Sequence, residues 1–113
     1  MMFLLFILCL SPHAEAAAAP VEVVKSFLRC GESADAEKAF HCRMEKIATN
    51  TKDWHKRRYA SDPLTWKLDS GLVACGDSAS PDVCGFIRLK TPGAHRKKIR
   101  FVLKGGRISS YRY

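Results

Sequence analysis

The spacing of apolar residues along the chain changes once, near Pro63. Before Pro63, apolar side chains recur every third or fourth residue, which is typical of one face of a helix. After Pro63 they recur every second residue, which is typical of one face of a β-strand. Because helices precede strands, the pattern predicts an α+β fold in which N-terminal helices pack on one face of a curved four-stranded antiparallel meander.

Three segments carry the helical pattern, at residues 20–30, 33–50 and 52–61. Gly31 is expected to end the first helix as a left-handed residue. Ser33 is expected to cap the second, and acidic residues in its first turn favour the helix dipole. The predicted apolar stripes are Val23, Val24, Phe27 and Leu28 in the first helix, and Ala36, Phe40, Met44 and Ile47 in the second.

The strands are predicted in four segments. The first covers 64–70, directs Leu64, Trp66 and Leu68 to one side and Thr65, Lys67 and Asp69 to the other, and continues past a bulge at Gly71. The second follows a turn and covers 83–90. Gly105-Gly106 is a two-residue hairpin signal between the last two strands, 98–104 and 107–113.

The first sixteen residues have the pattern of a secretory signal peptide, in which an apolar run is followed by a Ser11-Pro12 break and the small-residue site Ala14-Glu15-Ala16. We expect cleavage after Ala16, or at any point up to residue 19. The alternative is an N-terminal membrane anchor. Cleavage would leave one domain, residues 17–113, that is secreted or periplasmic.

Four cysteines follow this leader: Cys30, Cys42, Cys75 and Cys84. An even number of cysteines in an exported chain indicates disulfides. Three pairings exist, and the local one, Cys30–Cys42 with Cys75–Cys84, fits the predicted elements best. A zinc site at His41 and Cys42 is the weaker alternative, because no Cys-x-x-Cys pair is present. We expect no metal and no cofactor.

The chain is basic, with 19 Lys and Arg against 11 Asp and Glu and a net charge of +8. Such a balance favours attraction to anions in general. Strand-like alternation of Arg100 and Lys104 with apolar residues is explained completely as the solvated face of a sheet, which is the favoured interpretation. No nucleic-acid-binding motif is present, so a nucleic-acid partner is not expected. The candidate anion-binding residues are His55, Lys56, Arg57 and Arg58, and Arg96, Lys97 and Lys98.

Three stretches, residues 20–40, 64–70 and 101–113, resemble the nuclear-transport-factor-two-like (cystatin-like) superfamily, and in particular its small exported bacterial domains of unknown function. Arg107 departs from the pattern, since many members carry Trp there. The resemblance implies a cone between helices and sheet whose mouth takes a small ligand. The alternative is an ordinary apolar core made of the same residues, which are Phe27, Phe40, Trp54, Trp66, Phe86, Phe101 and Tyr111.

Enzymes of that superfamily place an acid–base pair inside the cone. Here no acid and histidine have a spacing that requires one pocket, although a general base must lie within hydrogen-bond reach of its target. A secreted ribonuclease with Lys97 or Lys98 as its cation is compatible with the composition, but no such motif is present. The sequence therefore favours a non-catalytic binding or interaction module, monomeric or homodimeric, whose partner is a protein, a small apolar ligand or an anionic surface. The residues weighed for catalysis are Asp53, Asp62, Asp69, His41, His55 and His95.

Overall fold

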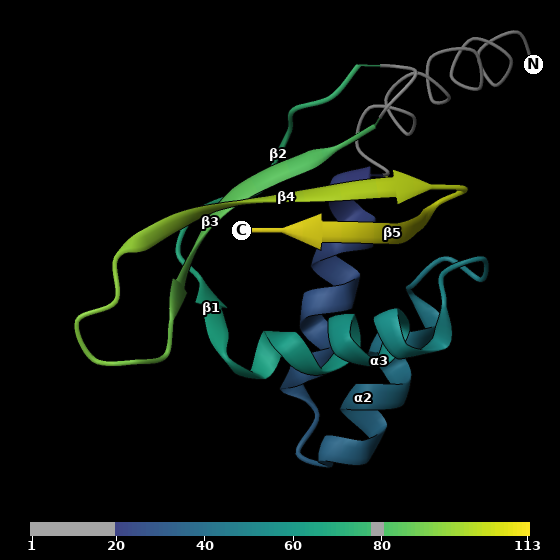
Figure 1. Cartoon of the computed structure of the whole chain (residues 1–113), viewed down its shortest axis with the longest axis horizontal. Coiled ribbons are helices and arrows are strands. Elements are labelled where there is room, and N and C mark those ends of the chain that lie inside the picture. The colour runs from purple at the N-terminus through teal and green to yellow at the C-terminus, as the bar shows by residue number, and fades with distance from the viewer. Residues whose placement is uncertain (1–19, 78–80) are drawn as a thin grey trace, which may run out of the picture.

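The computed structural model describes residues 20–77 and 81–113, so the expected signal peptide lies outside the described residues. The fold is α+β, with the helices before a curled antiparallel sheet, as predicted (Figure 1). None of the helices in the described ranges is long and apolar enough to cross a membrane. The elements are a helix at 20–29, η1 (Cys30–Glu32), α2 (Ala36–Glu45), α3 (Asp53–Ser61), η2 (Asp62–Leu64), β1 (Trp66–Leu68), β2 (Val73–Ala74), β3 (Val83–Leu89), β4 (Arg96–Lys104) and β5 (Arg107–Arg112).

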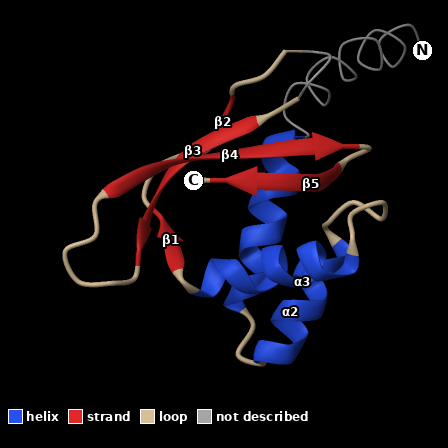
Figure 2. Ribbon diagram, in the orientation of Figure 1, coloured by secondary structure: helices blue, strands red, loops and turns tan. Residues whose placement is uncertain are grey.

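The sheet has the order β1-β3-β4-β5, with β2 also paired to β3, and all pairs are antiparallel (Figure 2). The first predicted strand is thus two short strands that share one partner and are interrupted between Leu68 and Val73. The strand does not begin at Leu64, because residues 62–64 form a 3-10 turn. The Asp62 carbonyl accepts from both the backbone N–H and the hydroxyl of Thr65 and closes that turn. Leu64 is consequently 61% exposed and not part of the core.

The helix boundaries differ from the prediction at two caps. Asp35, not Ser33, caps α2: its carboxylate accepts from the backbone N–H groups of Glu37 and Lys38. Gly31 lies within the 3-10 turn η1 and does not have the positive φ expected of a left-handed cap.

The second helix is also shorter than predicted. It ends at Glu45, because the backbone of Lys46 and Ala48 bonds to that of Ile108 and extends the chain beside β5. This pairing covers part of an edge strand that would otherwise be open. Ala36, placed in the apolar stripe by the sequence, is exposed, whereas Ala39 is buried.

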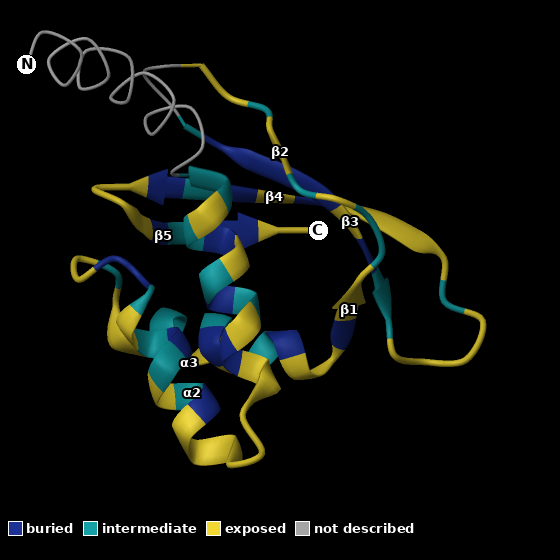
Figure 3. Cartoon of the chain, turned by 180° about the vertical axis from the view of Figure 1, so that it is seen from behind, coloured by how far each residue is buried: buried dark blue, intermediate teal, exposed yellow. Residues whose placement is uncertain are grey.

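The core lies between the helices and the inner face of the sheet, where most buried residues gather (Figure 3). Its centre is the ring of Tyr111, with centroids 5.1 Å from Phe101, 6.1 Å from Phe27 and 6.2 Å from Trp66. Edge and tilted contacts of this kind add to the apolar burial of the rings. Residues from the first helix and three strands thus meet at one point.

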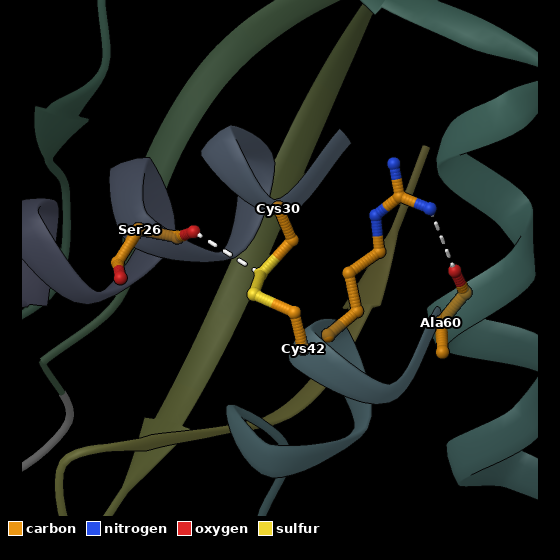
Figure 4. The surroundings of a disulfide bond; sticks show 5 residues. Ser26, Cys30, Cys42 and Ala60 are labelled. Carbon is orange, nitrogen blue, oxygen red and sulfur yellow. Dashed lines mark hydrogen bonds between the residues drawn. A yellow bond between two sulfur atoms is a disulfide. The ribbon is translucent and has the colours of Figure 1, made fainter. Parts of the chain in front are cut away.

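Two disulfides, Cys30–Cys42 and Cys75–Cys84, confirm the local pairing. The first joins η1, directly after the helix at 20–29, to α2, with a Cα–Cα distance of 5.6 Å (Figure 4). The second closes the loop between β2 and β3. Disulfides of this kind indicate an oxidising environment, extracellular or periplasmic.

Candidate functional site

The outer face of the sheet, turned away from the helices, is strongly basic. The strand register places Arg88 opposite Arg96, Arg100 opposite Arg112 and Lys104 opposite Arg107. Like charges directly opposite each other on one sheet face repel and destabilise the pairing. We call the cations that strands β3 to β5 present on this surface the basic face: Arg88, Arg96, Lys98, Arg100, Lys104, Arg107 and Arg112.

Two carboxylates neutralise only part of the basic face. Asp69 lies 3.2 Å from Arg88 Nη2 and 3.4 Å from Arg96 Nε. Asp82, which is 4% exposed, accepts from Arg100 Nε at 2.7 Å. In the part of the chain that the structure describes, four cations of the face make no ion pair; these are Lys98, Lys104, Arg107 and Arg112.

The two basic clusters of the sequence do not form one surface. Residues 55–58 lie in α3, in the helical layer, whereas residues 96–98 begin β4 (Figure 2). Within the second cluster, the guanidinium of Arg96 lies over the Phe86 ring at 4.1 Å. In the first, Arg57 is paired with Asp53 at 3.0 Å.

The helical cluster reaches the sheet instead at Arg112. His55, Arg58 and Arg112 line a surface pocket of about 260 Å³ together with Asp62 and three tyrosines, Tyr59, Tyr111 and Tyr113. The sequence did not predict this meeting, since it depends on how the last strand lies against α3.

This pocket brings together His55 and Asp62, one histidine and one acid of the set weighed for catalysis. Among the described residues no hydrogen bond joins them. The two oxygens of Asp62 accept from Trp66 Nε1 at 3.2 Å and from the Tyr113 hydroxyl at 2.9 Å. The His55 ring stacks on Trp54 with centroids 3.6 Å apart. Asp62 is therefore held as a structural acceptor.

Two tyrosines of the pocket, Tyr111 and Tyr113, resist ionisation. Burial raises the pKa of Tyr111 well above its usual range, and the charge of Asp62 raises it further. Burial also raises the pKa of Tyr113, as does its hydrogen bond to Asp62. Burial disfavours the charged form of any group that loses contact with water. Both hydroxyls consequently stay protonated, as hydrogen-bond donors, at neutral pH.

The residues expected to line a cone do not share one environment: some are buried in the core and others face solvent. Phe27, Trp66, Phe101 and Tyr111 are buried and pack on one another. Phe40 is half-buried at the edge of this core. Two others face solvent and are corrections to the prediction: Trp54 is 60% exposed on α3, and Phe86 lies on the outer face of β3. Alternation explains Phe86, because its neighbours Gly85 and Ile87 take the inner positions.

A buried arginine, Arg43 on α2, was missed by the sequence analysis. It is 5% exposed, and its Nη1 donates to the Ala60 carbonyl of α3 at 3.3 Å (Figure 4). Nε is buried without a hydrogen-bond partner. Burial lowers the pKa of this guanidinium. A buried polar group left unpaired costs about 1–3 kcal/mol. The only sequence signal was the position of Arg43, one turn after Ala39.

Arg43 also lines a second surface pocket, of about 310 Å³, between the first two helices and β1. Lys67 and Lys90 are the other charged residues of its lining, and no acid contributes. The apolar part of the lining is Leu28, Pro63, Leu64, Trp66 and Leu68. Within the described ranges, no group of His, Cys, Asp and Glu has the arrangement of a metal site.

The fold and these surfaces define a disulfide-stabilised α+β module whose exposed sheet face and helix–sheet pocket are both cationic. No protein-family model, curated protein or solved structure matches the chain.

Proposed function

We propose that this chain is an exported, non-catalytic binding module that docks the basic face of its sheet on an anionic phospholipid surface. The observation that carries the proposal is the like-charge pairing across β4 and β5, where Arg100 lies opposite Arg112 and Lys104 opposite Arg107. This repulsion destabilises the free protein. An anionic surface offsets it, since each Lys or Arg near such a surface contributes about 1 kcal/mol of binding.

Apolar side chains on the same face favour a lipid surface over an anionic polymer. Phe86 lies opposite Lys98, and Val73, which is 59% exposed, lies opposite Cys84. Apolar groups among cations are typical of proteins that lie on membranes. An anionic polymer would engage the cations and leave these two side chains in water.

The test is sedimentation with vesicles of pure phosphatidylcholine and with vesicles that also contain phosphatidylglycerol. We expect binding only to the anionic vesicles, decreasing as salt rises because salt screens exposed charges. The triple variant Lys104→Gln, Arg107→Gln and Arg112→Gln should bind on the order of 100-fold more weakly.

The matched control removes three cations from the helical side, by Arg29→Gln, Lys38→Gln and Lys52→Gln, all at exposed positions. It should retain binding. Equal losses in the two triple variants would indicate a net-charge effect and refute a role for the sheet face. Preference for a soluble polymer such as heparin over anionic vesicles would refute the lipid partner.

Descent from the nuclear-transport-factor-two-like superfamily is part of the same proposal. The curled antiparallel sheet with preceding helices supports it. An experimental structure that superposes strand for strand on members of that superfamily is its test.

A further inference from the structure

One side of the Arg43 guanidinium is unpaired, on a different surface from the basic face. Its only hydrogen bond to the described residues uses Nη1, and none of their acids pairs with it. A buried charge is retained in proteins when it is paired or hydrogen-bonded. The Nε of this guanidinium therefore lacks the partner that its burial demands.

Gly31 shapes the site around that unpaired side. A Cβ atom at residue 31 would lie 2.5 Å from Arg43 Nη2, well inside van der Waals contact. The backbone of Gly31 has no positive φ, so the turn itself does not require glycine. A side chain at residue 31 would therefore displace the end of the Arg43 guanidinium, and both residues line the 310 Å³ pocket.

The chemistry of the pocket lining selects the ligand. Its charged side chains, Arg43, Lys67 and Lys90, are all hydrogen-bond donors, whereas the Trp66 indole N–H already donates to Asp62. Leu64 and Leu68 are exposed beside them. A ligand that needs acceptors, such as a peptide with its N–H groups, finds none among these side chains. A carboxylate with an alkyl chain needs only donors and an apolar wall.

The geometry points to this pocket as the binding site of a small alkyl carboxylate, a medium-chain fatty-acid anion. The carboxylate accepts from the unpaired side of Arg43, as guanidinium–carboxylate pairs do. Lys67 and Lys90 add positive charge at the same pocket, and the alkyl chain lies against Leu64 and Leu68. A volume of about 310 Å³ lies at the lower end of the range for small-molecule sites, which fits a short chain.

The two tryptophans report binding in one experiment. Trp66 lines the pocket, whereas Trp54 is exposed on α3 and does not. Octanoate is titrated into the ¹⁵N-labelled, disulfide-bonded protein, and the two indole N–H signals are followed by NMR. We expect a saturable shift of the Trp66 signal and none of Trp54. Acetate, which lacks the chain, and 1-octanol, which lacks the charge, should each bind at least about tenfold more weakly.

Substitutions then locate the carboxylate. Arg43→Met keeps the length and apolar stem and should weaken octanoate binding about tenfold or more. Arg107→Met, at an exposed position on the basic face, is the matched control and should leave it unchanged. Because Arg43 also bonds to Ala60, the exposed pair Lys67→Met and Lys90→Met provides a second variant that should fold and bind more weakly. Gly31→Ala should weaken binding by displacing the guanidinium.

Three results would overturn the inference. One is no saturable Trp66 shift at millimolar octanoate. Another is equal affinity for octanol. The third is undiminished binding by folded Arg43→Met together with the lysine pair. Vesicle binding depends on other residues. A negative octanoate result therefore leaves the proposed membrane function standing, and a negative vesicle result leaves the octanoate site standing.

Discussion

The hydroxyl of Tyr111, in the last strand, donates a 2.6 Å hydrogen bond to the backbone carbonyl of Tyr59, in α3. The last carbonyls of a helix have no partner within the helix. In α3 the next carbonyl, of Ala60, is satisfied by Arg43 from α2. Side chains from two distant elements thus complete the end of α3 and hold it against the sheet.

Removal of the Tyr111 hydroxyl should destabilise the fold. Tyr111→Phe keeps the ring packing but leaves the Tyr59 carbonyl unpaired, so we expect a loss of about 1–3 kcal/mol in the free energy of unfolding. Urea denaturation followed by circular dichroism measures it. Tyr59→Phe is the control and should change stability by about 0.5 kcal/mol or less. Equal losses in the two variants would contradict a specific role of the Tyr111 bond.

Stability should also fall at alkaline pH. Burial raises the pKa of Tyr111, while the unfolded chain ionises near pH 10. The neutral hydroxyl therefore stabilises the fold fully below about pH 10, and this contribution is lost as pH rises above that value. Urea titrations from about pH 8 to pH 11 should show a steeper loss in the wild type than in Tyr111→Phe. Parallel curves for the two proteins would refute this assignment.

The two disulfides should contribute comparably to stability. They close loops of similar size, with sequence separations of 12 and 9. In the chain-entropy model each contributes about 3 kcal/mol. Paired alanine substitutions at Cys30 and Cys42, or at Cys75 and Cys84, should each lower the thermal midpoint by about 12–24 °C in calorimetry. Retention of the wild-type midpoint in either double variant would show that its bridge does not stabilise the fold.

The like-charge pair at the β4–β5 turn should respond to salt. Lys104 and Arg107 flank Gly105-Gly106, whose φ angles of 59° and 74° are those of a tight two-residue hairpin turn. Lys104→Gln should raise the free energy of unfolding by about 0.2–0.5 kcal/mol at low salt, because it removes the repulsion. The gain should disappear near 0.5 M salt. Lys38→Gln, exposed on α2, should show no such gain.

Local patterns in the sequence were sufficient for the class of fold, the order of helices and strands, the disulfide pairing and the glycine hairpin. Each depends on residues close together in the chain: apolar period, cysteine spacing and turn chemistry. The prediction that the first strand begins at Leu64 was wrong because a single 3-10 turn, closed by Thr65, delays the start of the strand.

Tertiary structure alone decided which basic residues lie close together and which basic residue is buried. Arg112 meets Arg58 because β5 lies beside α3, and Arg43 is buried where α2 packs on the end of α3, with its Nη1 bonded to the Ala60 carbonyl. The exposure of Trp54 is also decided by tertiary structure, since an aromatic ring is buried only where another element covers it. Apolar period specifies which face of an element turns inward, but long-range packing determines what that face meets.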